Sequence, residues 1–246
     1  MIPHTETLTI PCPYMGRDPR YPRTHAQLYH SHQSDPVLLL WLPGGPGQST
    51  DCSELEGLWG QRRILVPRNP YPIHSYRQTG PLTWDYVPQA FDTDQPLRIR
   101  SLIQWARSQR YRVFLGGHSN GVPRAVGYLA HSPRHQSLVD GVILSAGHVG
   151  GAYGPRLPLD RVEWSVPVLV LHHARDHCAK CSPAYQHWVY QTIARANRSH
   201  THMVCLTTGD PMIDTDCSGS ALHHMYRESL AEAAHAVDQF ILHTVS

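Results

Sequence analysis

The segment Tyr111–Ala130, YRVFLGGHSNGVPRAVGYLA, decides which fold the chain can adopt. Its apolar run Val113–Leu115 predicts a short buried strand. Residues Val122–Leu129 then have helical spacing, with apolar side chains on one face. Between the two lies a Gly-x-Ser-x-Gly motif with Ser119 at its centre, and glycines fit a tight turn because they leave room for neighbouring backbone. The segment therefore predicts a strand, a sharp turn and a helix.

Strand, Gly-x-Ser-x-Gly and helix together form the setting of a nucleophile elbow. Ser119 would stand at the carboxyl end of the strand, and the unpaired N–H groups of the next helix would face any negative charge there. Pro123 fits the first helical turn, where an N–H has no intrahelical partner. The same pattern also occurs by chance, as a glycine-rich turn whose serine has no catalytic role. Partners elsewhere in the chain must decide between the two readings.

Length and composition limit the classes of protein that the chain can represent. Its 246 residues, 41% hydrophobic, suit one large α/β domain spanning 1–246. A net charge of +2 gives no electrostatic case for nucleic-acid binding. The longest apolar run, Val37–Leu42, is strand-sized, so no membrane span is predicted. The N-terminus does not resemble a signal peptide, so a cytoplasmic location is expected, or export if an upstream signal has been removed.

Apolar runs and helical spacing alternate along the chain. Strands are predicted at 5–10, 26–29, 37–42, 64–66, 113–115, 139–144, 166–171 and 203–206. Helices are predicted at 97–107, 122–129, 184–196 and from about 225 to 242. Residues 67–96 are expected to form a long aromatic loop. This alternation predicts a mostly parallel sheet with helices on both faces.

A serine nucleophile needs a base and a carboxylate that orients the base. Asp176 follows the strand at 166–171, so it should lie on the same rim of the sheet as Ser119. The alternative role for Asp176 is to cap the helix that begins near Pro183. His223 and His224 directly precede the last helix, and only one of them can face the serine.

These motifs resemble the α/β-hydrolase superfamily, and in particular its small esterases without a lid. In those proteins the last helix is preceded by His-Gly-Phe or His-Gly-Tyr. Matching Tyr226 to that aromatic residue implies that His224 is the base, with His223 as the fallback. Met225 departs from the family glycine, which leaves the choice between the histidines open.

The resemblance also implies an oxyanion hole made from backbone N–H groups. One donor would be Asn120, the residue after the nucleophile. The other would be Gly45, in the Pro-Gly-Gly-Pro-Gly loop after 37–42, where Pro43 replaces the family histidine. The connection between 144 and 166 is too short and too rich in glycine and proline for a helical lid. The expected pocket is therefore open, with the 67–96 loop, Tyr153 and Trp164 as candidate walls.

The chain has six cysteines, at 12, 52, 178, 181, 205 and 217. Some members of the superfamily carry one cysteine just after the acid and another shortly before the base, which implies a disulfide between Cys178 and Cys217. The Cys178-x-x-Cys181 spacing also permits a zinc reading, but no second pair with finger-like spacing exists. We therefore expect no metal and no cofactor.

The expected function is that of a serine hydrolase that cleaves a small-molecule carboxylic ester through an acyl-enzyme. An amidase or thioesterase would use the same three residues. A non-catalytic binding protein on the same fold is a further alternative, because fold does not fix function. A metal-dependent hydrolase built on the cysteines and histidines is the last. The sequence does not indicate the preferred acyl group or the oligomeric state.

Overall fold

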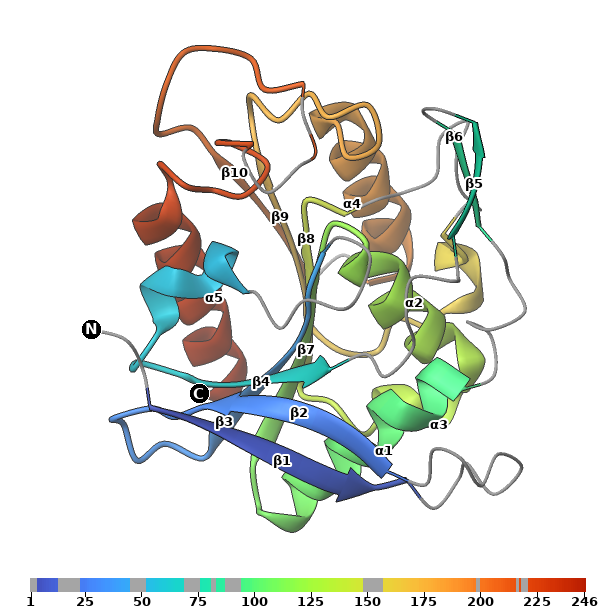
Figure 1. Ribbon diagram of the computed structural model, residues 1–246, viewed down its shortest axis with the longest axis vertical. Coiled ribbons are helices and arrows are strands. Elements are labelled where there is room, and N and C mark those ends of the chain that lie inside the picture. The colour runs from blue at the N-terminus through green and yellow to red at the C-terminus, as the bar shows by residue number, and fades with distance from the viewer. Residues whose placement is uncertain are drawn as a thin grey trace.

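The computed structural model describes residues 4–12, 23–44, 52–68, 76–80, 83–86, 94–147, 157–197, 200–215, 217 and 221–246. Within them an eight-stranded sheet forms the centre of the molecule (Figure 1). Its strands, in chain order, are β1 (Thr5–Pro11), β2 (Arg23–Tyr29), β3 (Val37–Leu42), β4 (Arg63–Arg68), β7 (Arg112–His118), β8 (Gly141–Ser145), β9 (Val168–His173) and β10 (Thr201–Leu206). Their order across the sheet is β1-β2-β4-β3-β7-β8-β9-β10.

The sheet is mostly parallel, as the sequence predicts. β1 pairs antiparallel with β2, and β2 pairs antiparallel with β4. Every pairing from β4 to β10 is parallel. The carboxyl ends of β3, β7, β8 and β9 therefore meet at one rim, which is where open α/β sheets bind ligands.

Strand β3 shows why both faces of the sheet are covered. All of its residues are buried, and successive side chains point to opposite faces. Val37, Leu39 and Trp41 enter one apolar core, whereas the alternate leucines of the strand enter the other. A continuous apolar run is therefore required here, because a polar side chain on either face would be buried.

Helices occupy both faces of the sheet (Figure 1). One core contains apolar side chains from α1 (Asp94–Ser108), α2 (Gly121–His131) and α4 (Pro183–Asn197). The other contains side chains from the 3-10 helix η2 (Ser53–Leu58) and from α5 (Leu230–Val245). The short helix α3 (Pro133–Gln136) follows α2 directly. No helix among the described residues is long and apolar enough to cross a bilayer.

The connection between β8 and β9 is short, as predicted. Its described parts, 146–147 and 157–167, contain only the 3-10 turn η4 (Leu159–Arg161). Trp164 is buried there and donates a hydrogen bond from Nε1 to the Leu159 carbonyl oxygen, 2.9 Å away. Trp164 thus packs in the core, and Tyr153 lies outside the described residues.

Some elements differ from the sequence prediction. The expected loop at 67–96 contains a hairpin, β5 (Tyr76–Gly80) and β6 (Thr83–Tyr86), whose strands are short and lack an apolar run. The last helix begins at Leu230 rather than near 225. Tyr226 has a φ of 56°, which lies in the left-handed region and cannot continue a right-handed helix.

Candidate active site

Ser119 occupies the sharp turn that the sequence predicts between strand and helix. β7 ends at His118, α2 begins at Gly121, and Ser119 has a φ of 49°. Its N–H donates to the Ser145 carbonyl oxygen, 2.9 Å away, which ties the turn to β8. A left-handed serine costs about 1–3 kcal/mol and persists only where its surroundings hold it.

Close backbone packing explains the two glycines that flank the serine. A Cβ at Gly117 would lie 2.5 Å from the Gly121 carbonyl oxygen. A Cβ at Gly121 would lie 1.8 Å from the Leu42 carbonyl oxygen, at the end of β3. Neither position can hold a larger residue without movement of the backbone. The spacing of the motif thus reflects steric need at this turn.

Asp176 and His224 form a buried pair at the same rim. Asp176 lies just after β9, and His224 lies between β10 and α5. Nδ1 of His224 is 2.8 Å from Oδ2 of Asp176. Their side chains are 1% and 0% exposed. Oδ1 of Asp176 accepts the Cys178 N–H at 3.1 Å, so both carboxylate oxygens have partners.

His223 points away from this pair. Its Nε2 lies 2.9 Å from the Met212 carbonyl oxygen, and its ring stacks on His173 with 4.2 Å between the ring centroids. Of the two neighbouring histidines, His224 is therefore the one that contacts Asp176.

The hydroxyl of Ser119 contacts a sulfur atom. Its Oγ lies 4.0 Å from Sγ of Cys181, and among the described residues it has no hydrogen bond to His224. Ser119 and Cys181 are both buried, at 8% and 1% exposure. Burial raises the pKa of the Cys181 thiol strongly, and the nearby Asp176 carboxylate raises it further, so this thiol is neutral. The sequence does not predict this contact between Cys181 and Ser119.

The structure describes one of the two expected oxyanion donors. Asn120 is the N-cap residue of α2 and directly follows Ser119. Gly45 lies outside the described residues. Its neighbour Gly44 is close to the serine, because a Cβ on Gly44 would lie 3.0 Å from Cβ of Ser119. The segment after β3 thus reaches the elbow.

Asp214 joins the segments that carry Asp176 and His224. Its Oδ2 accepts the N–H groups of His223 and His224 at 3.1 and 3.3 Å. Its own N–H donates to the Arg175 carbonyl oxygen, and its carbonyl oxygen accepts the His177 N–H. Asp214 therefore bonds to the residues on both sides of Asp176. No motif marks this aspartate, because its role depends on two loops meeting.

A buried hydrogen-bonded chain lies behind His224. Tyr226 Oη donates to the Leu171 carbonyl oxygen at 3.1 Å, and Ser145 Oγ donates to Tyr226 Oη at 2.9 Å. Since the Ser145 proton is used in this way, Nδ1 of His118, 3.0 Å from Ser145 Oγ, must be the donor between them. The His118 ring packs against the His224 ring, with 5.0 Å between centroids.

Burial keeps His118 neutral. Burial lowers the pKa of His118 well below its usual value, and a charge on His224 would lower it further. Burial likewise raises the pKa of Tyr226, so its hydroxyl keeps its proton. The sequence analysis identified His118 only as a residue of the Gly-x-Ser-x-Gly motif, and Tyr226 only as the match to the family aromatic residue. It did not predict the hydrogen bonds of either residue.

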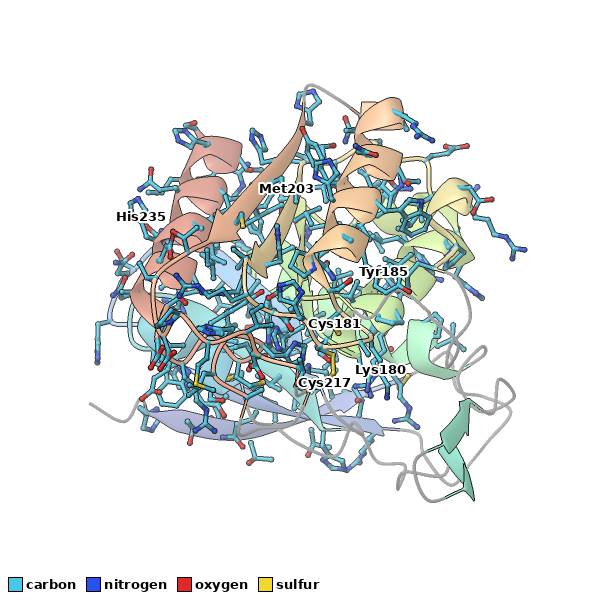
Figure 2. All side chains as sticks on the ribbon, turned by 90° about the horizontal axis from the view of Figure 1, so that it is seen from above. Lys180, Cys181, Tyr185, Met203, Cys217 and His235 are labelled. Carbon is cyan, nitrogen blue, oxygen red and sulfur yellow. A yellow bond between two sulfur atoms is a disulfide. The ribbon has the colours of Figure 1, made fainter. Side chains whose placement is uncertain are left out.

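Cys178 and Cys217 are joined in a disulfide, which Figure 2 draws in yellow beside the Cys217 label. Their Cα atoms are 5.4 Å apart. Because Cys178 follows Asp176 and Cys217 follows Asp214, the bond links the same two segments that Asp214 bridges. Among the described residues Cys12, Cys181 and Cys205 are free cysteines, and Cys52 is not in a disulfide.

Comparison with known proteins agrees with this architecture. No family model and no curated protein matches the chain. Among solved structures, TT1662 from Thermus thermophilus is similar with a TM-score of 0.68 and 17% identity, over 100% of this chain and 99% of that one. Dienelactone hydrolase from Anabaena variabilis gives 0.61 and 13%, over 99% of both chains. A hyperthermophilic esterase from Pyrobaculum calidifontis gives 0.65 and 13%, over 98% of this chain and 87% of that one.

The chain has the α/β-hydrolase fold over its full length. Its sheet is mixed but mostly parallel, and the likeness includes several esterases. Identities this low establish the fold, and the activity must be argued from the residues at the rim.

Proposed function

We propose that the protein is a serine hydrolase that cleaves carboxylic esters of small molecules through an acyl-enzyme. The observation that carries the proposal is the buried 2.8 Å contact between Asp176 and His224, at the same rim of the sheet as a left-handed Ser119 on the elbow. A carboxylate on Nδ1 fixes the tautomer that leaves Nε2 as a proton acceptor. A buried imidazole with that polarity fits general-base chemistry.

The proposed reaction begins with a rotation of the Ser119 side chain. Its Oγ turns from Cys181 towards His224, which takes the hydroxyl proton as Oγ attacks the ester carbonyl carbon. Catalytic hydrogen bonds commonly tighten in this way only when substrate is bound. The N–H groups of Asn120 and Gly45 then hold the oxyanion. His224 returns the proton to the leaving alcohol, and water repeats the cycle to release the acid.

Hydrolysis of p-nitrophenyl esters with graded acyl chains tests the proposal, with wild type beside Ser119→Ala. We expect measurable turnover for the wild type and a loss of about 10⁴-fold or more in kcat for the variant. Ser137→Ala, which changes an exposed serine, is the matched control. Matching amides and thioesters in the same assay separate the alternative acyl groups.

Covalent labelling separates an enzyme from a binding protein on the same fold. A fluorophosphonate should attach to Ser119 in the wild type, detected by mass spectrometry of the peptide. If neither labelling nor turnover is observed, the protein is a non-catalytic binding protein on the same fold.

A further inference from the structure

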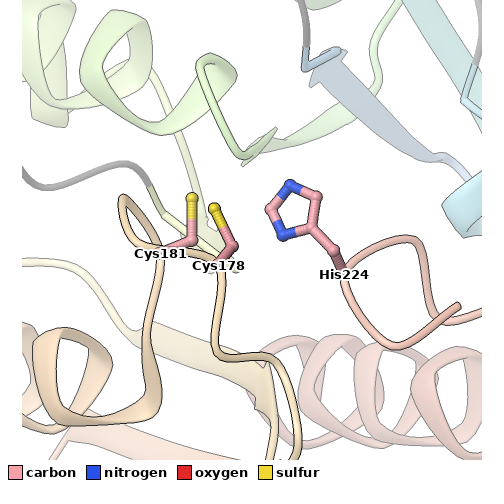
Figure 3. A group of neighbouring side chains, drawn as sticks. All are labelled: Cys178, Cys181 and His224. Atoms are coloured by element: carbon pink, nitrogen blue, oxygen red, sulfur yellow. The ribbon is translucent and has the colours of Figure 1, made fainter. Parts of the chain in front are cut away.

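Three side chains with metal-binding atoms meet next to the elbow (Figure 3). They are Cys178, Cys181 and His224, and the sulfur atoms and a ring nitrogen lie within 4.8 Å of one another. All three residues are buried. The two cysteines belong to the loop after β9, and His224 comes from the segment before α5, so the fold brings the group together.

Two thiolates and an imidazole are ligands that Zn²⁺ prefers. Ligand atoms about 2.0–2.3 Å from a tetrahedral zinc lie roughly 3.5–3.8 Å from one another, so only a small contraction of the cluster is needed. The buried Asp176 carboxylate, in contact with His224, adds a negative charge that favours a cation. The cluster therefore fits a soft divalent metal in composition and in size.

The disulfide determines whether the cluster can bind a metal ion. Sγ of Cys178 is bonded to Cys217, which removes it as a thiolate ligand. The two halves of this bond differ in access, because Cys217 is exposed whereas Cys178 is 0% exposed. A reducing thiol can reach the Cys217 side of the bond.

We propose that reduction of the Cys178–Cys217 disulfide converts this cluster into a Zn²⁺ site that switches the hydrolase off. A small thiolate attacks Sγ of Cys217, the S–S bond breaks, and the electron pair leaves with Cys178 as a thiolate. A second thiol resolves the mixed disulfide, so that two thiols are oxidised as the protein disulfide is reduced. Zn²⁺ then binds the Cys178 thiolate, the Cys181 sulfur with release of its proton, and His224.

The inhibitory part of this proposal rests on the proposed function. Zinc on Nε2 of His224 takes the lone pair that would accept the serine proton. Zinc on Nδ1 breaks the hydrogen bond to Asp176. Either mode of binding removes the general base, and Ser119 Oγ lies beside the same cluster through its contact with Cys181.

Zinc binding is measured first, without substrate, by competition with a chromophoric chelator. Cys217→Ser frees Cys178 permanently, so this variant should bind one zinc per chain without reductant. The oxidised wild type should bind none at this site, and the reduced wild type should bind one. The reduced wild type also keeps the test valid where Cys217→Ser folds poorly.

Further variants in the Cys217→Ser background identify the ligands. Adding Cys181→Ser should weaken zinc binding by about 100-fold or more, above the 10–100-fold loss typical of a supporting contact. Adding Cys205→Ser, at an exposed free cysteine on β10, is the matched control and should change nothing. Equal zinc affinity of Cys217→Ser and oxidised wild type would overturn the proposal, as would an unchanged affinity with Cys181→Ser.

Ester hydrolysis is then followed with and without zinc. Stoichiometric zinc should inhibit Cys217→Ser and leave the oxidised wild type active, and a chelator should restore the activity. Zinc binding by a chain that never hydrolyses esters would refute the proposed function and leave the metal site standing. Normal hydrolysis by zinc-loaded Cys217→Ser would refute the switch.

Discussion

The imidazole of His224 and the carboxylate of Asp176 are 2.8 Å apart, although 48 residues separate them along the chain. Both side chains are removed from solvent, so the interaction between them is little screened by salt. Because Nδ1 of His224 is bonded to Asp176, only Nε2 is available to accept a proton.

Replacing each of the two neighbouring histidines should have different effects. His224→Ala should lower kcat/KM for p-nitrophenyl esters by about 10⁴-fold, because it removes the proposed base. His223→Gln should keep most of the activity, because His223 stacks on His173 away from the pair. Steady-state kinetics of the two variants check this assignment, and the reverse pattern would move the base to His223.

Asp214 should act as a positioning residue for His224. Asp214→Ala removes the acceptor of two backbone N–H groups, and the resulting shift of His224 should lower kcat by about 10²-fold with KM nearly unchanged. Asp214→Asn retains an amide oxygen that can accept these bonds and should restore most of kcat. A purely structural role would instead lower the free energy of unfolding of Asp214→Ala and leave kcat intact.

The chain from His118 to Tyr226 should stabilise the protein as a unit. Tyr226→Phe removes the acceptor of the buried Ser145 hydroxyl, and Ser145→Ala removes the acceptor of His118 Nδ1. Each should lower the free energy of unfolding by about 1–3 kcal/mol in urea denaturation. The double variant should cost less than the sum, because the two losses share one hydrogen bond. Strict additivity would show that these residues act independently.

Stability should fall as the solution becomes acidic, in part through His172. Burial is the main reason why the pKa of this histidine drops to about 4, with neighbouring His173 and His187 also lowering it and Asp176 opposing the shift. Between pH 6.5 and 4 the unfolded chain binds a proton that the folded chain does not. The free energy of unfolding therefore falls as pH decreases, by about 1.4 kcal/mol per pH unit for this one group.

Denaturation at a series of pH values checks this prediction. His172→Gln should reduce the slope of unfolding free energy against pH between about pH 6 and 4.5 by close to one proton. The slope is the relevant quantity, because the substitution also changes the absolute stability. An unaltered slope would mean that other groups account for the acid sensitivity.

Local sequence predicted the parts of the site that depend on local geometry. The elbow was predictable because steric contacts at Gly117 and Gly121 leave a short, recognisable spacing. The mostly parallel character of the sheet was predictable from the alternation of strands and helices. The roles of Ser119, Asp176 and His224 in catalysis stay predictions, and their placement at one rim is consistent with them.

Features that depend on contacts between distant segments could not be predicted from the sequence. Asp214 and Cys181 act through contacts across loops, and neither lies in a pattern that predicts such contacts. The start of the last helix was placed too early, because the apolar period continues through Tyr226 although its backbone is left-handed. The β5–β6 hairpin was missed because its short strands have the composition of a loop.

The left-handed backbone of Ser119, Ala146 and Tyr226 also has an evolutionary consequence. Within the described residues only one other non-glycine, Arg110, shares this conformation, so most of such strain lies around the elbow. Glycine at these positions would relieve the strain, because it adopts positive φ without a steric cost. A lineage that gained heat stability through such substitutions would lose the hydroxyl of Ser119 or the hydrogen bonds of Tyr226. We therefore expect these rim positions to keep their strained residues, whereas stabilising substitutions can accumulate elsewhere in the sheet.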